Sequence, residues 1–592
     1  MKHSLKYRPH YFCLLILLLV NGCRLQAPDT ANQADSNLII NPDLPKKPNI
    51  LWLVAEDLSP YIPPFGDSTV QTPNLNRLAL EGVRYTNFYS PSGVCAPSRC
   101  AIATGMYPSS LGGHNMRTQY AQAHMDSLGL ILYEVVTPPA VKMMSEVLRM
   151  NGYYCTNNDK TDYQFAPPVT AWDESSRYAH WRNRPKGKPF FSIFNFGITH
   201  ESQVFGPSSK RNLRYNENFP QDPATDPVAG WGEKIDSSEW HFNVPEDLEV
   251  PIPPYLPDTD PVKNDIRRLY SNIIEMDKQV GILLKQLEED GELENTIIVW
   301  YSDHGGPLPR QKRLLYDSGI KVPLIIRYPG KQFAAEIDDQ LISFIDLAPT
   351  TFFMAGIPVP QHLQGRSFLD PSTTPKRQYI HAAADRFDTE YDMIRAVRDK
   401  KFKYLKNFKP DKPYYLPVAY RENMATMKEL LRLNASGELN AFQAQWFRSA
   451  KPEEELFDCE ADPHELNNLA DDPAYHDKLV ELRNECMRWM DEIGDKGNVP
   501  EKDLITSFWP DWQQPVTENP IVSNEDGLIS ASCATPGASI GYQVISEGQP
   551  APTQWQVFTE PFAINARQKV VALAHRIGFK PSKKVTFNPV QP

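Results

Sequence analysis

The strongest constraint on the fold is a series of short, almost wholly apolar segments in the first two thirds of the chain. Residues 49–55 read Asn-Ile-Leu-Trp-Leu-Val-Ala, and similar runs cover 190–196, 296–301 and 322–327. A strand with apolar residues on both faces must be buried on both faces, which is typical of a parallel sheet covered by helices. In residues 266–287, apolar side chains recur every three or four positions, which predicts a long amphipathic helix. We therefore expect a doubly wound, mostly parallel α/β domain.

Length and net charge restrict the number of domains and the partners that this chain can bind. A chain of 592 residues is too long for one core and predicts two to four domains. The formal net charge of −12 argues against binding to nucleic acid or to an anionic membrane surface. If the substrate is an anion, its attraction must come from a few well-placed cationic side chains.

The N-terminus is typical of an export signal. Lys2, Lys6 and Arg8 precede the apolar run 12–20, which is too short to span a bilayer. We interpret 1–22 as a signal peptide and 23–46 as a linker, and expect export to the periplasm or cell surface of a bacterium. Cys23 follows a small residue, as in a lipoprotein signal, so the signal is either cleaved before Cys23, which then carries a lipid anchor, or cleaved in the ordinary way near Ala27.

Two further regions follow the α/β domain, which we place at 47–373. Residues 374–500 predict a smaller α+β subdomain, with a hairpin over 393–407 and a helix around 479–490. Residues 516–592 carry short strand-like runs and many turn residues, and resemble the small β-sandwich appended to chitobiases and hexosaminidases. The eight cysteines of the chain show no metal-type pairing, and we expect no disulfide framework.

One motif combines a cysteine with an anion-binding environment. Residues 95–105 read Cys-Ala-Pro-Ser-Arg-Cys-Ala-Ile-Ala-Thr-Gly, and Pro97 suits the first turn of a helix. Cys95 then lies near the N-terminus of this helix, where free backbone N–H groups favour an anion. Arg99 lies one turn along on the same face. From these residues alone, Cys95 is either a nucleophile beside an anion site or a small buried hydrophobic residue.

The same motif resembles the signature of type I sulfatases, of the alkaline-phosphatase-like superfamily, and the resemblance extends from about Lys47 to about Asp495. It implies that a formylglycine-generating maturation enzyme converts Cys95 to 3-oxoalanine (formylglycine), whose hydrate is the nucleophile. It also implies a sulfatase fold with a C-terminal α+β subdomain. The sulfamidase and bacterial polysaccharide sulfatase branches have similar loops around the signature.

Acidic residues end two of the predicted strands. Glu56 and Asp57 follow the run 49–55, and Asp303 and His304 follow 296–301. Carboxylates meeting at one sheet edge repel each other unless a cation neutralises them, and hard oxygen ligands favour Ca²⁺, with Mg²⁺ second. The resemblance implies the same calcium site, faced by Cys95, although Glu56 replaces the more usual aspartate.

The resemblance also assigns the remaining catalytic residues, in addition to Arg99. Lys160 and Lys312 match the two active-site lysines of the family, and His200 matches its sulfate-contacting histidine. A histidine suits proton donation to the leaving oxygen because its pKa lies near neutrality. Asp162 stands where the family has a histidine, so the base that deprotonates the hydrate is left open.

The chemistry implied is hydrolysis of sulfate esters, or N-sulfates, of polysaccharides or oligosaccharides, with release of inorganic sulfate. A metal-dependent phosphatase or phosphodiesterase on the same fold is the main alternative. A cysteine hydrolase using Cys95 directly and an inactive carbohydrate-binding protein are weaker ones. We expect Ala383, Asp385 and Arg386 as further candidates for substrate contact. The sequence leaves the sugar, endo or exo action and the oligomeric state open.

Overall fold

The computed structural model describes residues 40–205, 243–372 and 375–588. The predicted signal peptide, Cys23 and the linker as far as residue 39 lie outside the described residues, as do 206–242. Within the described ranges, no helix is both long enough and apolar enough to cross a membrane.

The first domain is built on a nine-stranded mixed sheet with the order β4-β3-β5-β1-β6-β7-β2-β8, and β9 also pairs with β2. Strands β3, β5, β1 and β6 are parallel neighbours, whereas β7 runs antiparallel to both β6 and β2. The mostly parallel sheet predicted from the apolar runs is therefore confirmed. Its strands are β1 (Asn49–Ala55), β2 (Val83–Tyr89), β3 (Tyr154–Asn158), β4 (Glu174–Ser175), β5 (Phe190–Phe196), β6 (Thr296–Ser302), β7 (Lys321–Arg327), β8 (Ile337–Asp338) and β9 (Ile342–Ser343).

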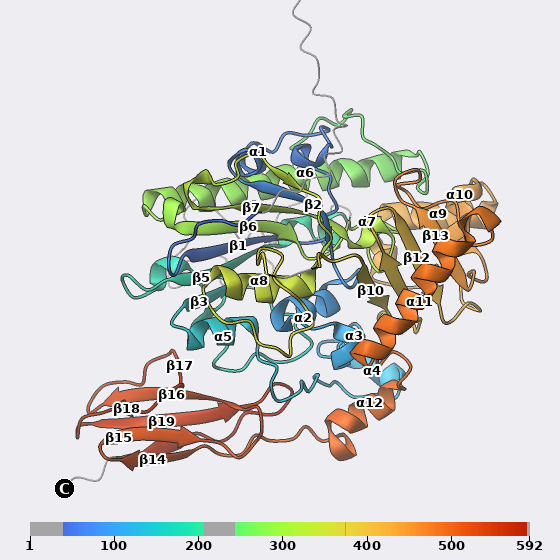
Figure 1. Ribbon diagram of the computed structural model, residues 1–592. Helices are drawn as coiled ribbons and strands as arrows, with labels where there is room; N and C mark the ends of the chain where they lie inside the picture. Colours follow the sequence, from blue (N-terminus) through green and yellow to red (C-terminus); the bar gives the residue numbers. More distant parts are fainter. Residues whose placement is uncertain (1–39, 206–242, 373–374, 589–592) are drawn as a thin grey trace, which may run out of the picture. The chain divides into compact units, whose positions relative to one another are not determined.

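Helices cover both faces of this sheet (Figure 1). One face carries α1 (Pro73–Glu81) and the long α6 (Asp260–Glu289), and the other carries α2 (Cys95–Thr104), α5 (Met144–Met150) and α8 (Leu347–Met354). The apolar stripe of α6 lies in the core that includes β1, as its periodicity predicts. Every residue of β1 is buried, which explains why that strand shows no polar alternation.

The second region, at the yellow-to-orange part of the chain in Figure 1, contains a four-stranded antiparallel sheet. The predicted hairpin is present as β11 (Ile394–Arg398) and β12 (Phe402–Asn407), flanked by β10 (Ile380–Ala384) and β13 (Glu454–Asp458). The predicted helix is α11 (His476–Ile493), which packs its apolar residues on this sheet. Shorter helices are α3 (Pro108–Leu111), α4 (Gln122–Ser127), α7 (Asp317–Ile320), α9 (Ala425–Ser436), α10 (Ala441–Ala444) and α12 (Glu501–Phe508).

The C-terminal strands form two antiparallel sheets, β14-β15-β18 and β17-β16-β19-β20. Their inner faces meet through an apolar cluster in which Tyr542 stacks on Phe562 at 4.3 Å between ring centroids. This is the all-β architecture expected for the region. The strands are β14 (Ile521–Glu525), β15 (Leu528–Ser532), β16 (Ser539–Ser546), β17 (Gln556–Val557), β18 (Phe562–Ala563), β19 (Gln568–His575) and β20 (Val585–Phe587). The six described cysteines are all free, so this part of the chain contains no disulfide.

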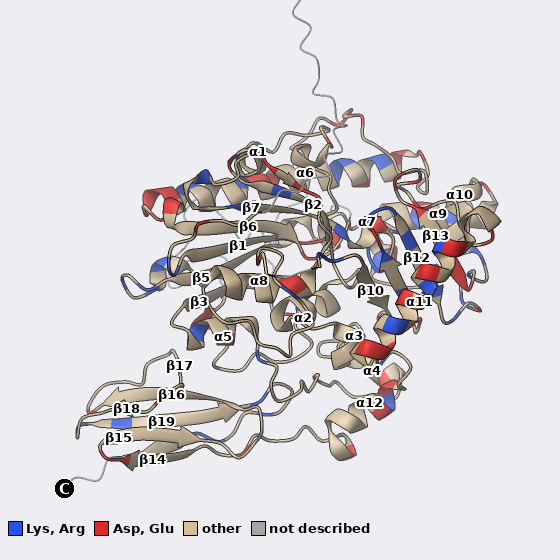
Figure 2. Cartoon of the chain, in the orientation of Figure 1, with Lys and Arg blue, Asp and Glu red and all other residues tan. Residues whose placement is uncertain are grey.

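Buried ion pairs join the first two regions. In Figure 2, β1 and β6 carry no charged residues, whereas α11 carries residues of both signs. Between the regions, Asp317 of α7 accepts hydrogen bonds from Arg398 at 3.1 Å and lies 2.5 Å from Lys403 Nζ. Burial opposes the charge of Asp317, but Arg398 and Lys403 outweigh it and hold its pKa well below the usual range. Lys403 also pairs with Glu465. Asp317, Glu465, Arg398 and Lys403 therefore form one salt-bridge network.

We predict that Asp317→Ala destabilises the protein by about 3–5 kcal/mol, because it leaves two buried cations short of a partner. The matched control is Asp339→Ala, which breaks an exposed pair with Lys400 (2.7 Å) and should cost at most about 1 kcal/mol. Urea unfolding of both variants measures the difference. Equal losses would show that the buried network contributes no more than a surface pair.

Candidate active site

The predicted site residues converge at the carboxyl ends of β1, β5 and β6. Glu56 and Asp57 follow β1, Asp303 and His304 follow β6, and His200 lies in the turns after β5. Helix α2 places Cys95, its first residue, opposite this edge. In parallel sheets ligands bind at this edge because the loops diverge there and leave room.

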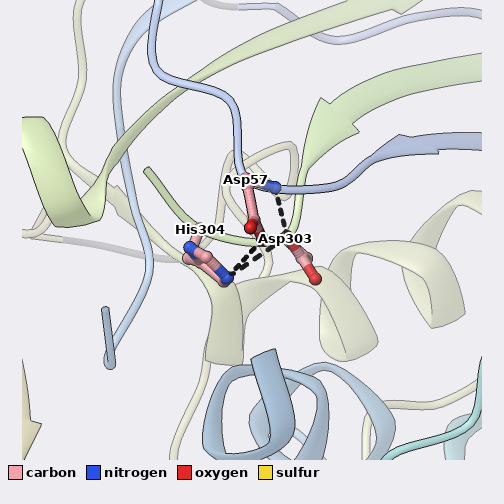
Figure 3. Close-up of side chains that lie close together, drawn as sticks. All are labelled: Asp57, Asp303 and His304. Atoms are coloured by element: carbon pink, nitrogen blue, oxygen red, sulfur yellow. Dashed lines mark hydrogen bonds and ion pairs between the residues drawn. The ribbon is translucent and has the colours of Figure 1, made fainter. Parts of the chain in front are cut away.

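Three of the four predicted metal ligands face one another (Figure 3). Asp57, Asp303 and His304 have one ligand atom each within 4.8 Å of the others, and all three side chains are fully buried. His304 Nε2 lies 2.9 Å from Asp57 Oδ1 and 3.8 Å from Asp303 Oδ1. Despite that proximity, neither Asp57 Oδ1 nor His304 Nε2 makes a hydrogen bond of normal geometry within the described chain. Buried polar atoms of this kind normally have a partner.

A divalent cation fits this arrangement. The two carboxylates supply hard oxygen donors, and the imidazole supplies one softer nitrogen donor. A cation between them would satisfy the two orphaned atoms at once. Asp57 also adopts a left-handed backbone conformation, with φ of 52°, and such strain in a non-glycine residue is concentrated at functional sites.

Glu56 is placed beside the three ligands and not among them. Its carboxylate lies 3.4 Å from Lys160 Nζ and 3.7 Å from Arg99 Nη2. Burial opposes its ionisation, but Lys160 and Arg99 outweigh burial and lower the pKa of Glu56 to about 2. The carboxylate is therefore ionised and anchors two of the predicted catalytic cations.

Cys95 begins helix α2 as the proline pattern predicts, and it is only 3% exposed. Burial, and next the nearby carboxylate of Asp162, raise the pKa of the Cys95 thiol to about 12. The thiolate is the reactive form of cysteine, so the thiol as encoded is a poor nucleophile at neutral pH. This disfavours the alternative of a cysteine hydrolase.

Arg99 lies one turn further along α2 and is held by hydrogen bonds. Its Nε donates to Asp303 Oδ2 at 3.1 Å, and its Nη1 donates to the side-chain oxygen of Asn195 at 2.7 Å. The guanidinium therefore orients a predicted metal ligand while keeping positive charge beside Cys95. Asn195 belongs to β5, and the sequence pattern gave no sign of its contribution.

Lys312 and His200 lie together beside Asp57, and Lys312 is the cation of the two. Lys312 Nζ lies 2.6 Å from Asp57 Oδ2 and 3.5 Å from His200 Nε2. Burial and the neighbouring Lys312 ammonium lower the pKa of His200. His200 Nδ1 lies 2.9 Å from the Ser202 hydroxyl. This contact fixes the ring so that Nε2 is the atom left beside Lys312.

Glu201 is a structural member of the site that the sequence interpretation missed. It accepts hydrogen bonds from Arg313 at 2.8 and 2.9 Å and lies 3.2 Å from Lys312 Nζ. Arg313 is thus a structural residue whose guanidinium is fixed by Glu201. The only feature of the sequence that could have indicated Glu201 as a site residue is its position next to His200.

These side chains line a cavity of about 230 Å³. Cys95, Lys160, Asp162, His200 and Lys312 all contribute to its wall. The Asp162 carboxylate lies 3.8 Å from Lys160 Nζ. Asp162, like Asp57, has a left-handed backbone, with φ of 60°.

Ala383 at the end of β10, and Asp385 and Arg386 in the loop just after it, do not line the cavity, contrary to the expectation of substrate contact. Arg386 is fully buried and bound to Glu501 at 2.7 and 2.8 Å, and Asp385 pairs with Arg395 at 3.1 Å. These ion pairs turn both side chains away from the cavity, and Ala383 is buried as well. Asp388, later in the same loop, lines the cavity together with Arg117 and Tyr420.

Comparison with known proteins identifies the class to which this fold and site belong. A family model described as "Sulfatase" matches residues 48–357, and one described as "N-sulphoglucosamine sulphohydrolase, C-terminal" matches 310–430. The chain therefore belongs to the sulfatase family, as the motif at Cys95 predicts.

Individual relatives extend this likeness to most of the chain. An ulvan-active sulfatase of Formosa agariphila is 55% identical over 551 residues, covering 92% of each chain. Human N-sulphoglucosamine sulphohydrolase is 24% identical, covering 76% of this chain and 90% of its own. The solved structure of BT4656 in complex with D-glucosamine-2-N, 6-O-disulfate has a TM-score of 0.52 at 19% identity, covering 77% of this chain and 99% of its own. That likeness confirms the fold.

We predict that the purified protein binds about one divalent cation per chain, with Ca²⁺ preferred to Mg²⁺, and that Asp303→Asn weakens binding by more than about tenfold. Asp173→Asn serves as the control, because Asp173 is a largely buried aspartate paired with Arg149 outside the site. Calorimetric titration and elemental analysis give affinity and stoichiometry without any turnover. Equal binding by both variants would place the cation elsewhere.

Proposed function

We propose that this protein is an exported sulfatase that hydrolyses sulfate esters of a sulfated polysaccharide, or of its oligosaccharides, and releases inorganic sulfate. The observation that carries the proposal is the 55% identity, over nearly the whole chain, with a sulfatase described as ulvan-active. The grouping of Cys95, Lys160, His200 and Lys312 around one cavity supports it.

Two groups that are not encoded by the chain complete the proposed chemistry. Formylglycine at position 95, made by a maturation enzyme, supplies a hydroxyl nucleophile when hydrated. Asp57, Asp303 and His304 would hold a cation, with Glu56 and residue 95 as the further predicted ligands, and that cation would supply positive charge for the sulfate oxygens. Calcium is the cation we favour because carboxylates dominate the donor set.

The cationic side chains hold the sulfate. Lys160 and Lys312 both line the cavity, and Arg99 adds charge from beneath Cys95. Each is already oriented by a carboxylate, so no reorganisation is needed when charge develops during transfer. The acidic partners keep the lysines protonated, because Glu56 and Asp57 outweigh the effect of burial and raise the pKa values of Lys160 and Lys312.

His200 is the group we assign to protonation of the leaving oxygen. Its Nε2 lies 3.5 Å from Lys312 Nζ at the cavity wall. In the free protein, burial and Lys312 lower its pKa, and an anionic sulfate bound between them would offset the lysine charge. Substrate binding therefore favours the protonated imidazole at the moment when a proton is required.

Asp162 is the group we assign to proton removal at residue 95. Its carboxylate is the second cause of the raised Cys95 pKa, after burial, which places negative charge near the Cys95 side chain. A carboxylate at this position can accept a proton from a hydroxyl on residue 95 and pass it to solvent through the cavity. The histidine that the family has at this position is thus replaced by another base.

Export remains a proposal from the sequence of residues 1–22. It accounts for a polysaccharide substrate, which is too large to enter a cell intact. A lipid anchor at Cys23 would hold the enzyme at the cell surface, where such a substrate is met.

We predict that Cys95→Ala abolishes sulfate release from aryl sulfates and ulvan oligosaccharides, because the nucleophile can no longer form. Cys100→Ala is the matched control. It removes a buried thiol five residues further along the same helix and should keep most of the activity. Mass spectrometry of the peptide containing residue 95 should show the aldehyde. Active protein with only an unmodified thiol, or faster release of phosphate than of sulfate, would contradict the proposed function.

We predict that Asp162→Asn lowers kcat by about 10²-fold, the low end of the range for loss of a general base, with little change in KM. Asp162→His restores a base and should recover part of the rate, with its pH dependence shifted towards the histidine pKa. Steady-state kinetics across pH on one aryl sulfate measures both effects. A wild-type kcat for Asp162→Asn would remove this residue from the mechanism.

A further inference from the structure

A second cavity adjoins the active-site cavity and shares three residues with it. This outer cavity, of about 420 Å³, is lined by Arg117, Asp388 and Tyr420, which also line the first, and by residues of the segments around His124 and Asn423. The inner cavity alone is smaller than the roughly 300–1,000 Å³ typical of ligand pockets. With the outer cavity, the combined space enters that range.

We propose that the outer cavity is a subsite for the sugar ring next to the sulfated sugar. The inference rests on the proposed sulfatase function and defines its substrate as an oligosaccharide or longer glycan. Its position supports this, because the Tyr420 ring lies 6.5 Å from the His200 ring, between centroids. The sugar bearing the sulfate must lie beside His200, since that residue protonates its oxygen. The neighbouring ring is then directed past Tyr420 into the outer cavity.

The shared wall has the chemistry that recognises a sugar. Arg117 places its guanidinium carbon 5.2 Å from the centre of the Tyr420 ring and donates its Nε to Asp388 Oδ1. Neither terminal amino group of Arg117 makes a hydrogen bond within the described chain, and the same holds for Asp388 Oδ2. Donors and an acceptor beside an aromatic face can bind the hydroxyls and the apolar face of a pyranose.

The wall is also rigid. Arg117 and Asp388 both adopt left-handed backbone conformations, with φ of 60° and 50°. This conformation is costly for an arginine, so the surroundings must hold Arg117 in it. The Asp388 backbone carbonyl accepts a hydrogen bond from Arg386, whose own guanidinium is fixed by Glu501. The buried ion pair between Arg386 and Glu501 keeps Arg386 away from the substrate. Through the Arg386 hydrogen bond, the same pair holds Asp388 where it can contact the substrate.

The test measures binding without turnover. In the Cys95→Ala background, calorimetry compares a sulfated disaccharide released from ulvan with the sulfated monosaccharide obtained from it. We expect the disaccharide to bind about tenfold more tightly. Ala419→Trp, at an exposed residue lining only the outer cavity, should abolish that gain by filling the space. Ala435→Trp, at an exposed alanine of α9, is the matched control and should retain it.

Equal affinities for the two sugars, including no binding by either, would overturn the subsite. So would a gain that survives Ala419→Trp. Turnover of an aryl sulfate by the unaltered protein tests the sulfatase function separately, because that substrate carries no second ring. A protein that hydrolyses aryl sulfates but binds both sugars equally would keep its function and lose the proposed subsite.

Discussion

Charge compensation at one buried edge of the sheet is the constraint on which the rest of the structure depends. Asp57, Asp303, Glu56 and Glu201 are all nearly or fully buried there. Such a group of carboxylates is tolerated only if cations face it at short range. Arg99, Lys160, Lys312 and Arg313 supply those cations. Three of these side chains, Arg99, Lys160 and Lys312, are the ones that we propose bind the anionic substrate, so the same charges also allow the site to fold.

This dependence explains how much the sequence could reveal. Apolar strands such as β1 are locally encoded, because burial on both faces leaves no other composition possible. The meeting of Asp57 and Asp303, which follow two of those strands, was also predictable, because parallel strands end at a common edge of the sheet. The start of α2 at Cys95 followed from the position of Pro97. Helix ends followed less closely from the pattern, and the helix expected around 479–490 extends from His476 to Ile493.

Long-range partners were beyond prediction. Asn195, Glu201 and Asp388 act through contacts with residues about one hundred or more positions away, and no local pattern marks them. The loop after β10 illustrates the difficulty. Asp385 and Arg386 were the residues of this loop expected to contact substrate, and Asp388 was not among the candidates. Only the placement of Glu501, far along the chain, decides that Arg386 turns inward and Asp388 faces the cavity.

The burial of α2 has a consequence for the order of events in the life of the protein. All ten residues of this helix are buried, and Cys95 retains 3% of its surface. A second protein could not close its own active site around a side chain so enclosed. If Cys95 is converted to formylglycine, the conversion must occur while the segment is still an extended chain. Folding and maturation then compete, and molecules that fold first are permanently inactive.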